Sequence, residues 1–236
     1  MKNKTTKPLF AAIALSVGLL SATTGNAALI DNGSTIYDTD LNITWLTNAN
    51  LADTQNFGVS GIDAYGGMNW NTTGLWIAAM NTANYLGYND WRLPTVTDTG
   101  TSGCNFAYSG TNCGYNVNTA TGEMAHLFYD ELGNKSIYTT SGSGPQPGWG
   151  LTNTGPFSNF QSNVYWSGTE YALSTDGAWI FNTSDGSQNA YFKDDPLFAL
   201  AVRPGQVAAA PVSVPEPVTL ALFGMGLAGL GWARRR

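Results

Sequence analysis

Two short apolar segments, one near each end of the chain, set the limits on what this sequence can fold into. They span residues 9–20 and 218–232, and neither contains a charged residue. As a helix, the 15-residue second segment would extend about 22 Å, less than the roughly 30 Å hydrocarbon core of a bilayer. Between the two segments, residues 28–205 contain about 180 residues without the features of a signal or a linker. That length predicts one domain with a core of its own, over 28–205.

The N-terminal segment has the features of an export signal. Three lysines precede it, and the small residues Gly25 and Ala27 fit a cleavage site before Ala28. A retained membrane helix is the alternative, but about a dozen apolar residues are too few to span a bilayer. We therefore predict a signal peptide over 1–27 and export of the mature chain by the cell's export machinery.

The C-terminal segment lies between two further features. It is preceded by Pro215, Glu216 and Pro217 and followed by Arg234, Arg235 and Arg236. The arginines favour the cytoplasmic side of a membrane, where their side chains can extend into the headgroup layer. With help from these charges, residues 218–232 could form a short transmembrane helix. An Ala/Pro-containing stretch, 206–213, has the composition of a linker to the domain.

This arrangement over 214–236 resembles the PEP-CTERM sorting signal; a plain membrane anchor is the alternative. The resemblance implies a Gram-negative, exopolysaccharide-producing cell in which an exosortase cuts the tail near the motif. The chain would then be held transiently at the inner membrane and end in the outer envelope or outside the cell.

The charge of the predicted domain disfavours several classes of partner. Residues 28–205 contain four cations and fifteen carboxylates, a net charge of −11. Nucleic-acid binding needs clustered Lys and Arg to release phosphate counterions, and anionic lipid surfaces also attract cations. We expect neither partner for the mature domain.

The two cysteines, Cys104 and Cys113, are nine residues apart. In an exported chain, an even count at short spacing favours a disulfide over free or functional thiols. Zinc would need more Cys or His ligands, and His126 is the chain's only histidine. We expect no metal and no cofactor, with calcium as the one cation left open.

Hydrophobic periodicity predicts an α+β domain. Two β-rich runs surround an Asp/Thr turn in 34–46, and 178–193 is typical of a hairpin that turns at Asp185-Gly186. A further apolar strand is expected over 197–204.

Helical spacing of apolar residues indicates two helices, 74–86 and 122–132. Thr121 is the expected N-cap of the second helix and Gly133 its C-terminal stop. Long Gly/Asn/Ser/Thr-rich loops connect these elements.

These elements carry phrases that resemble the Lcl C-terminal-like domain over nearly the whole mature chain. The phrases are NDWRLPT (89–95), EMAHLFYDELG (123–133), YWSGTE (165–170), Trp179 in the following strand, and AVRPG (201–205). The resemblance implies a C-type-lectin-like or formylglycine-generating-enzyme-like fold, with two helices packed on small antiparallel sheets and long irregular loops. It implies no established reaction.

Three residues of these phrases favour structural roles. Pro94 restricts its own φ and that of Leu93, so Trp91 can enter the core while Arg92 pairs with a carboxylate. Arg203 is expected to hold the last strand to the domain. A substrate clamp by Arg92 is the alternative.

The sequence contains no strong pattern of catalytic residues. The cysteines do not lie near 201–205, where the formylglycine-generating fold keeps its redox pair. The carboxylate neighbours at 130–131 and 194–195 indicate solvated charges rather than the paired acids of glycoside hydrolysis. His126 lies among apolar residues, which favours a structural role. An enzyme with an unrecognised site stays an alternative.

We therefore expect a binding or structural protein of the envelope or extracellular matrix, without catalysis. Loops are where binding usually occurs, and the loop 141–162 places Trp149 and Phe157 among glycines and prolines. These two residues are the candidate contacts for a glycan or exopolysaccharide. A calcium-dependent lectin-like adhesin is the alternative, although the lectin triplets Glu-Pro-Asn and Gln-Pro-Asp do not occur.

Overall fold

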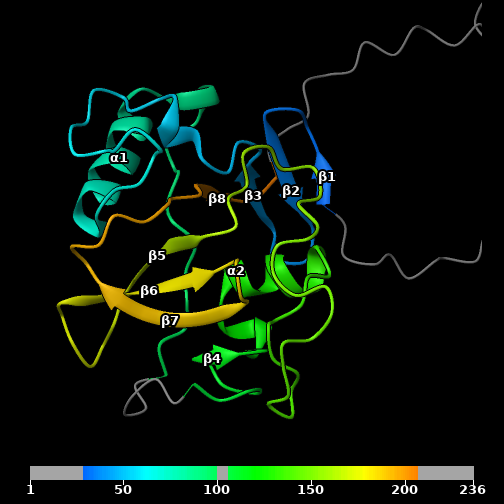
Figure 1. Ribbon diagram of the computed structural model, residues 1–236. Helices are drawn as coiled ribbons and strands as arrows, with labels where there is room; N and C mark the ends of the chain where they lie inside the picture. The colour runs from blue at the N-terminus through cyan, green and yellow to red at the C-terminus, as the bar shows by residue number, and fades with distance from the viewer. Residues whose placement is uncertain (1–28, 100–105, 207–236) are drawn as a thin grey trace, which may run out of the picture.

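The computed structural model describes residues 29–99 and 106–206, which fold into two four-stranded antiparallel sheets and two short helices. This is the α+β class that the sequence predicts; the C-type-lectin-like arrangement stays a prediction. Figure 1 shows the sheets as separate layers, with helices α1 and α2 well apart. The signal peptide and the sorting tail lie outside the described residues. In the part described, no helix is long and apolar enough to cross a membrane.

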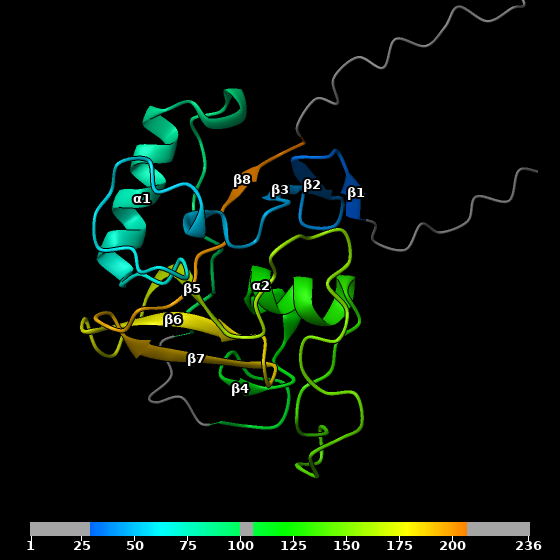
Figure 2. The ribbon, with the colours of Figure 1, turned by 45° about the horizontal axis from the view of Figure 1, so that its top comes forward.

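The first sheet joins the two ends of the domain. Its strand order is β1-β2-β3-β8, all antiparallel, so the chain enters through β1 and leaves through β8 of one sheet (Figure 2). The predicted turn between two β-rich runs is confirmed between β2 and β3. The strands are β1 (Leu29–Asp31), β2 (Thr35–Asp38), β3 (Ile43–Leu46) and β8 (Val202–Pro204).

The second sheet has the order β4-β7-β6-β5 and contains the predicted hairpin. Strands β6 and β7 pair in register from Asn182–Ser187 to Gly177–Phe192, and Gly186 turns between them at φ 75°. The strands are β4 (Gly114–Tyr115), β5 (Val164–Glu170), β6 (Gly177–Asn182) and β7 (Ser187–Phe192).

The predicted strand over 197–204 forms only in part. Residues 197–201 instead link the two sheets: the backbones of Leu197 and Met68 exchange hydrogen bonds, and the amide of Phe198 donates to Val164 of β5. Regular pairing begins at Val202, opposite Trp45 of β3.

The first helix begins four residues before its predicted start and ends four residues before its predicted end. Helix α1 (Trp70–Thr82) begins after Asn69, whose side chain accepts a hydrogen bond from the amide of Thr72. It ends because Asn84 takes a left-handed φ of 50°. The short 3-10 turns are η1 (Leu51–Asp53), η2 (Tyr85–Gly87) and η3 (Thr119–Thr121).

The second helix is an α-helical turn, α2 (Glu123–His126), followed by a π-helical segment, η4 (Leu127–Glu131). The N-cap is Gly122, not Thr121 as expected, because the Thr121 hydroxyl donates to the carbonyl of Asn118 instead. The predicted stop is confirmed, with Gly133 at φ 63°. The π segment carries one extra residue per turn and ends in a hydrogen bond from the amide of Leu132 to the carbonyl of Leu127.

Tryptophans fill much of the core. Trp45, Trp76 and Trp166 are completely buried, and each indole N–H has an acceptor: the Asp38 carboxylate, the Gln55 carbonyl and the Met68 carbonyl. Buried indoles need such partners because an unpaired N–H is costly away from water. One continuous apolar cluster reaches from the first sheet through both helices to the second sheet.

Candidate functional site

The loop chosen from the sequence does not present two aromatic side chains together. Phe157 is 6% exposed and packs 5.3 Å from Phe160, ring centroid to ring centroid. Its burial follows from the backbone, because the amide of Ser158 donates to Thr47 and its carbonyl accepts from Ala49. These bonds hold the loop against the first sheet, so Phe157 is buried there and is not the exposed ring that the sequence predicts.

Trp149 does stand at the surface, with 42% of the residue exposed. The loop around it is fixed by the next residue: the amide of Gly150 donates to the Lys135 carbonyl, and a Cβ atom at Gly150 would lie 2.7 Å from the Ser184 carbonyl oxygen. Trp149 is not among the residues that line the two surface hollows described next. It is therefore an exposed ring that lies outside both of these hollows.

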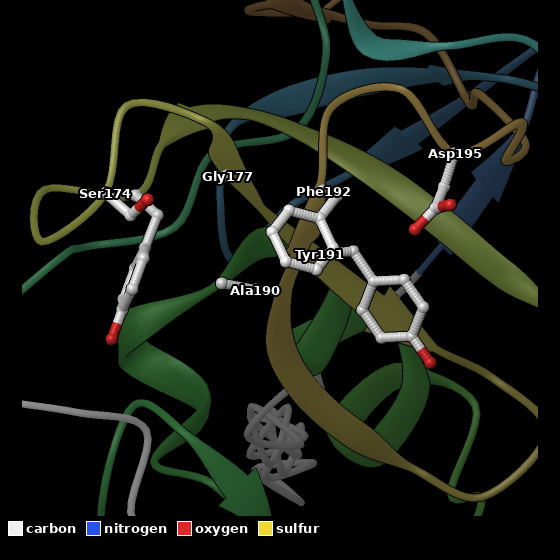
Figure 3. Close-up of a pocket in the computed structure, with 7 residues that line it drawn as sticks. Ser174, Gly177, Ala190, Tyr191, Phe192 and Asp195 are labelled. Atoms are coloured by element: carbon white, nitrogen blue, oxygen red, sulfur yellow. The ribbon is translucent and has the colours of Figure 1, made fainter.

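The larger hollow is a groove of about 450 Å³ at the end of β7 (Figure 3). Its lining comes from the β5–β6 loop (171–176), the strand ends and the segment after β7. We call it the β7 groove, and it consists of Tyr171, Ser174, Gly177, Ala190, Tyr191, Phe192 and Asp195. Sequence analysis missed it because no local pattern joins residues from these segments.

The wall formed by Tyr171 is rigidly supported. Its ring meets Trp179 edge to face, with centroids 5.5 Å apart. The Trp179 indole N–H in turn donates to Asp98 at 2.9 Å, and the same carboxylate oxygen accepts the amide of Ala172 at 2.8 Å. The side of the groove is thus built on a buried tryptophan and a shared carboxylate acceptor.

Lys193 holds the opposite end of the β5–β6 loop. Its ammonium donates to the carbonyl of Thr175 at 2.6 Å and pairs with Glu170, and it lies 4.5 Å from the centroid of the Trp70 ring. Its own amide donates to the carbonyl of Asp176. One residue therefore connects the end of β7 to both ends of the loop that borders the groove.

Two aromatic residues at consecutive positions of β7 supply most of the apolar lining of the groove. Phe192 is 71% exposed and Tyr191 is 40% exposed, although both are large enough to be expected in a core. Exposed apolar area beside a hollow is typical of a binding surface. The Asp195 carboxylate adds a hydrogen-bond acceptor, and Gly177 and Ala190 keep space open between the larger side chains.

A second hollow, of about 400 Å³, lies between α1 and the Arg92 segment. Arg92 lines it, but both ends of its guanidinium donate to the Glu123 carboxylate at 2.7 Å. One of these nitrogens also donates to the carbonyl of Leu93. A substrate would have to compete with this pair, so the geometry favours a structural arginine over a clamp.

The other two residues for which the sequence favours structural roles, Trp91 and Arg203, also form hydrogen bonds within the domain. Trp91 is buried and donates its indole N–H to the carbonyl of Tyr85. Arg203 pairs with Asp90 through two nitrogens, at 2.6 and 2.9 Å, and covers the ring of Tyr88. The hydrogen bond from Arg203 lowers the pKa of Asp90.

The sequence predictions for disulfide and sorting residues fall largely on undescribed parts. Cys113 is disulfide-bonded, while Cys104 lies outside the described residues, so their pairing stays a prediction. The motif Pro215-Glu216-Pro217, the arginines at 234–236 and the apolar segment 218–232 also lie outside.

One group of side chains in the described residues could hold a metal ion: Asp38, His126 and Glu131. It joins β2 to the α2–η4 segment, away from the elements of the β7 groove. Burial raises the pKa of Glu131, and the negative charge of Asp38 raises it further, whereas His126 lowers it. Sequence analysis missed this group because Asp38 is far along the chain from the other two residues.

Comparison with known proteins identifies two matches. The model of the Lcl C-terminal domain family matches residues 34–203, and that of the PEP-CTERM protein-sorting motif matches 213–236. No curated protein and no solved structure matches the chain. The sorting motif marks an exported protein that is processed by an exosortase, in the envelope or outside the cell. Because the first match covers well over half of its length, the chain belongs to the Lcl C-terminal domain family.

Proposed function

We propose that the processed protein is a binding protein of the cell surface or extracellular matrix, and that the β7 groove binds a neutral glycan such as a segment of exopolysaccharide. The observation that carries the proposal is the pair of exposed rings, Tyr191 and Phe192, beside a hollow with a carboxylate. Rings of this kind can pack on the apolar faces of a sugar while polar groups orient its hydroxyls.

Charge supports a neutral ligand over a polyanion. The domain carries −11, and three of its four cations are already paired: Arg92 with Glu123, Lys193 with Glu170 and Arg203 with Asp90. The groove itself contains Asp195, which would repel an acidic sugar. A calcium ion would be needed to bridge a polyanion to this surface.

The position of the groove suits a protein that is held by its C-terminal tail. Both ends of the domain belong to the first sheet, whereas the groove lies on the second sheet. Figures 1 and 2 show the free end of β7 on the opposite side of the domain from β1. A chain attached through its tail would therefore present the groove outward.

The lining favours binding over catalysis. Asp195 is the one carboxylate among the groove residues, and no histidine or cysteine lines it. Hydrolysis of a glycoside in most families requires two carboxyl groups placed on either side of the bond. We therefore propose that the groove binds a glycan and does not cleave it.

The test is a glycan array with the exported protein, with and without calcium, for the wild type and for Ala190→Leu. Leucine at this position would fill the groove and leave its aromatic rings in place. We expect neutral oligosaccharides to bind without calcium and the filled variant to lose this binding. Equal binding by both proteins would exclude the groove, and binding only with calcium would favour a calcium-dependent lectin-like adhesin.

A further inference from the structure

A second set of converging side chains lies where β2 approaches the α2–η4 segment. One ligand-type atom each from Asp38, His126 and Glu131 lies within 4.8 Å of the other two. Asp38 is completely buried, the Glu131 side chain is 1% exposed and the His126 side chain 13%. The group is thus almost closed to solvent, with the imidazole at its accessible edge.

The three side chains are fixed by their surroundings. One oxygen of Asp38 accepts the amides of Asp40 and Leu41, and the other accepts the Trp45 indole N–H. The π-helical segment places Glu131 five residues after His126, with Nε2 and Oε1 3.3 Å apart. Two ligands of a tetrahedral ion with bonds of 2.0–2.1 Å are separated by about 3.3–3.4 Å.

The second nitrogen of the imidazole supports the same assignment. His126 Nδ1 lies 3.1 Å from the Asp130 carboxylate. When Nδ1–H donates to that carboxylate, the lone pair of Nε2 faces Glu131. Metal-bound histidines commonly have this arrangement, with the outer N–H oriented by a carboxylate. Without a metal ion, Nε2 would need a proton of its own to donate to Glu131, and the imidazole would then be positively charged.

Negative charge also accumulates here without a basic side chain. Of the four cations in the described chain, Arg92, Lys193 and Arg203 are paired with other carboxylates, and Lys135 is exposed. Two buried carboxylates therefore share, at most, the single positive charge of one imidazole. Buried carboxylates are costly unless they are paired or coordinate a metal.

We propose that Asp38, His126 and Glu131 bind one divalent transition-metal ion, zinc in preference to manganese, which fastens β2 to the α2–η4 segment. An imidazole with two carboxylates suits these ions, whereas calcium takes six to eight oxygen ligands. The burial of the ligands disfavours access of a substrate to the ion. This proposal departs from the expectation from the sequence that no metal binds, and it is independent of the glycan proposal.

The experiment uses the exported protein, without a histidine tag and treated with EDTA. Thermal melting is followed as zinc, manganese or calcium chloride is added, and the imidazole of His126 is followed by NMR. Since His126 is the only histidine, its ring nitrogens report binding without ambiguity. We expect zinc to raise the melting temperature saturably with one equivalent bound, and to shift Nε2 more than Nδ1.

Two ligand variants and one control complete the test. Glu131→Gln and His126→Gln should lose the zinc-dependent rise, whereas Asp194→Asn, which removes an exposed carboxylate elsewhere, should keep it. If a variant fails to fold, the NMR and stoichiometry of the wild type still decide. An unchanged melting temperature and unchanged ring signals at millimolar zinc would overturn the proposal. So would an imidazole that responds to pH alone, because a proton would then occupy the site.

Discussion

The guanidinium of Arg92 and the carboxylate of Glu123 form a two-point ion pair, with both nitrogen–oxygen distances at 2.7 Å. One oxygen of Glu123 also accepts the amide of Thr95. The pair therefore connects the bend at Pro94 to the first residue of α2. This structural role explains the presence of an arginine in the stretch NDWRLPT (89–95), although the domain contains only four cations.

We predict that Arg92→Lys destabilises the domain although the charge is kept. Lysine is a point charge and cannot reproduce the planar fork that meets both carboxylate oxygens. Hydrogen bonds to charged groups contribute about 1.5–3 kcal/mol, and we expect a loss near the lower end, because Arg92 is one third exposed. Urea unfolding would measure it. A lysine variant as stable as the wild type would show that the fork is unimportant.

The turn at Gly186 is predicted to tolerate no side chain. Its φ is 75°, and a Cβ atom there would lie 2.7 Å from the Tyr129 hydroxyl and 2.9 Å from Ser136 Cα. Gly148 has a similar φ of 73° but open space around it. Gly148→Ala should therefore cost only the backbone strain, about 1 kcal/mol. Gly186→Ala should cost clearly more in the same denaturation assay, and equal losses would disprove the steric account.

Tyr129 should make the fold sensitive to alkaline pH. Burial raises its pKa to about 12, from about 10 in the unfolded chain. The stability from the neutral phenol is therefore complete below pH 10 and is lost as pH rises toward 12. Two pKa units correspond to at most about 3 kcal/mol. Tyr165, whose pKa burial also raises, should lose stability in the same direction.

The measurement compares the pH dependence of unfolding for the wild type and for Tyr129→Phe. The phenylalanine variant should lose less stability between pH 10 and 12, even though removing the hydroxyl lowers stability at neutral pH. Tyr65→Phe, at an exposed tyrosine, is the control and should follow the wild type. Parallel curves for all three proteins would mean that Tyr129 is not the group that titrates.

The sorting motif gives a prediction about processing. Replacement of Pro215, Glu216 and Pro217 by alanine should leave export intact and trap an uncut form in the membrane fraction. Val214→Ala, beside the motif, is the control. Cell fractionation and mass spectrometry would distinguish the forms. Mature protein of unchanged mass outside the cells would contradict the role of the motif.

Local patterns in the sequence predicted the parts of the fold that depend on neighbouring residues. The hairpin at Gly186 and the helix stop at Gly133 follow from glycine's access to positive φ, which is a property of one position. The helix boundaries were less accurate. The start of α1 depends on the Asn69 side chain, which acts as the N-cap. Later polar residues in the same stretch are also of types that can cap a helix, so the sequence does not single out Asn69.

Local sequence patterns do not predict features that are formed by segments far apart in the chain. Phe157 looked like a loop residue but is buried, because Ser158 pairs with the backbone next to β3. The β7 groove and the Asp38, His126 and Glu131 group both combine residues that only the topology brings together. Such sites follow from tertiary packing, and a single sequence carries no local signal for them.

The most direct test of the binding account is a calorimetric titration of the best array glycan into the wild type, Tyr191→Ala and Phe192→Ala. Each substitution removes one exposed ring from the β7 groove and should weaken binding about tenfold or more, equivalent to about 1.4 kcal/mol, with little change in melting temperature. Tyr65→Ala removes an exposed ring elsewhere and should bind as the wild type does. Unchanged affinity in both groove variants would contradict the account, as would loss of binding in Trp149→Ala alone.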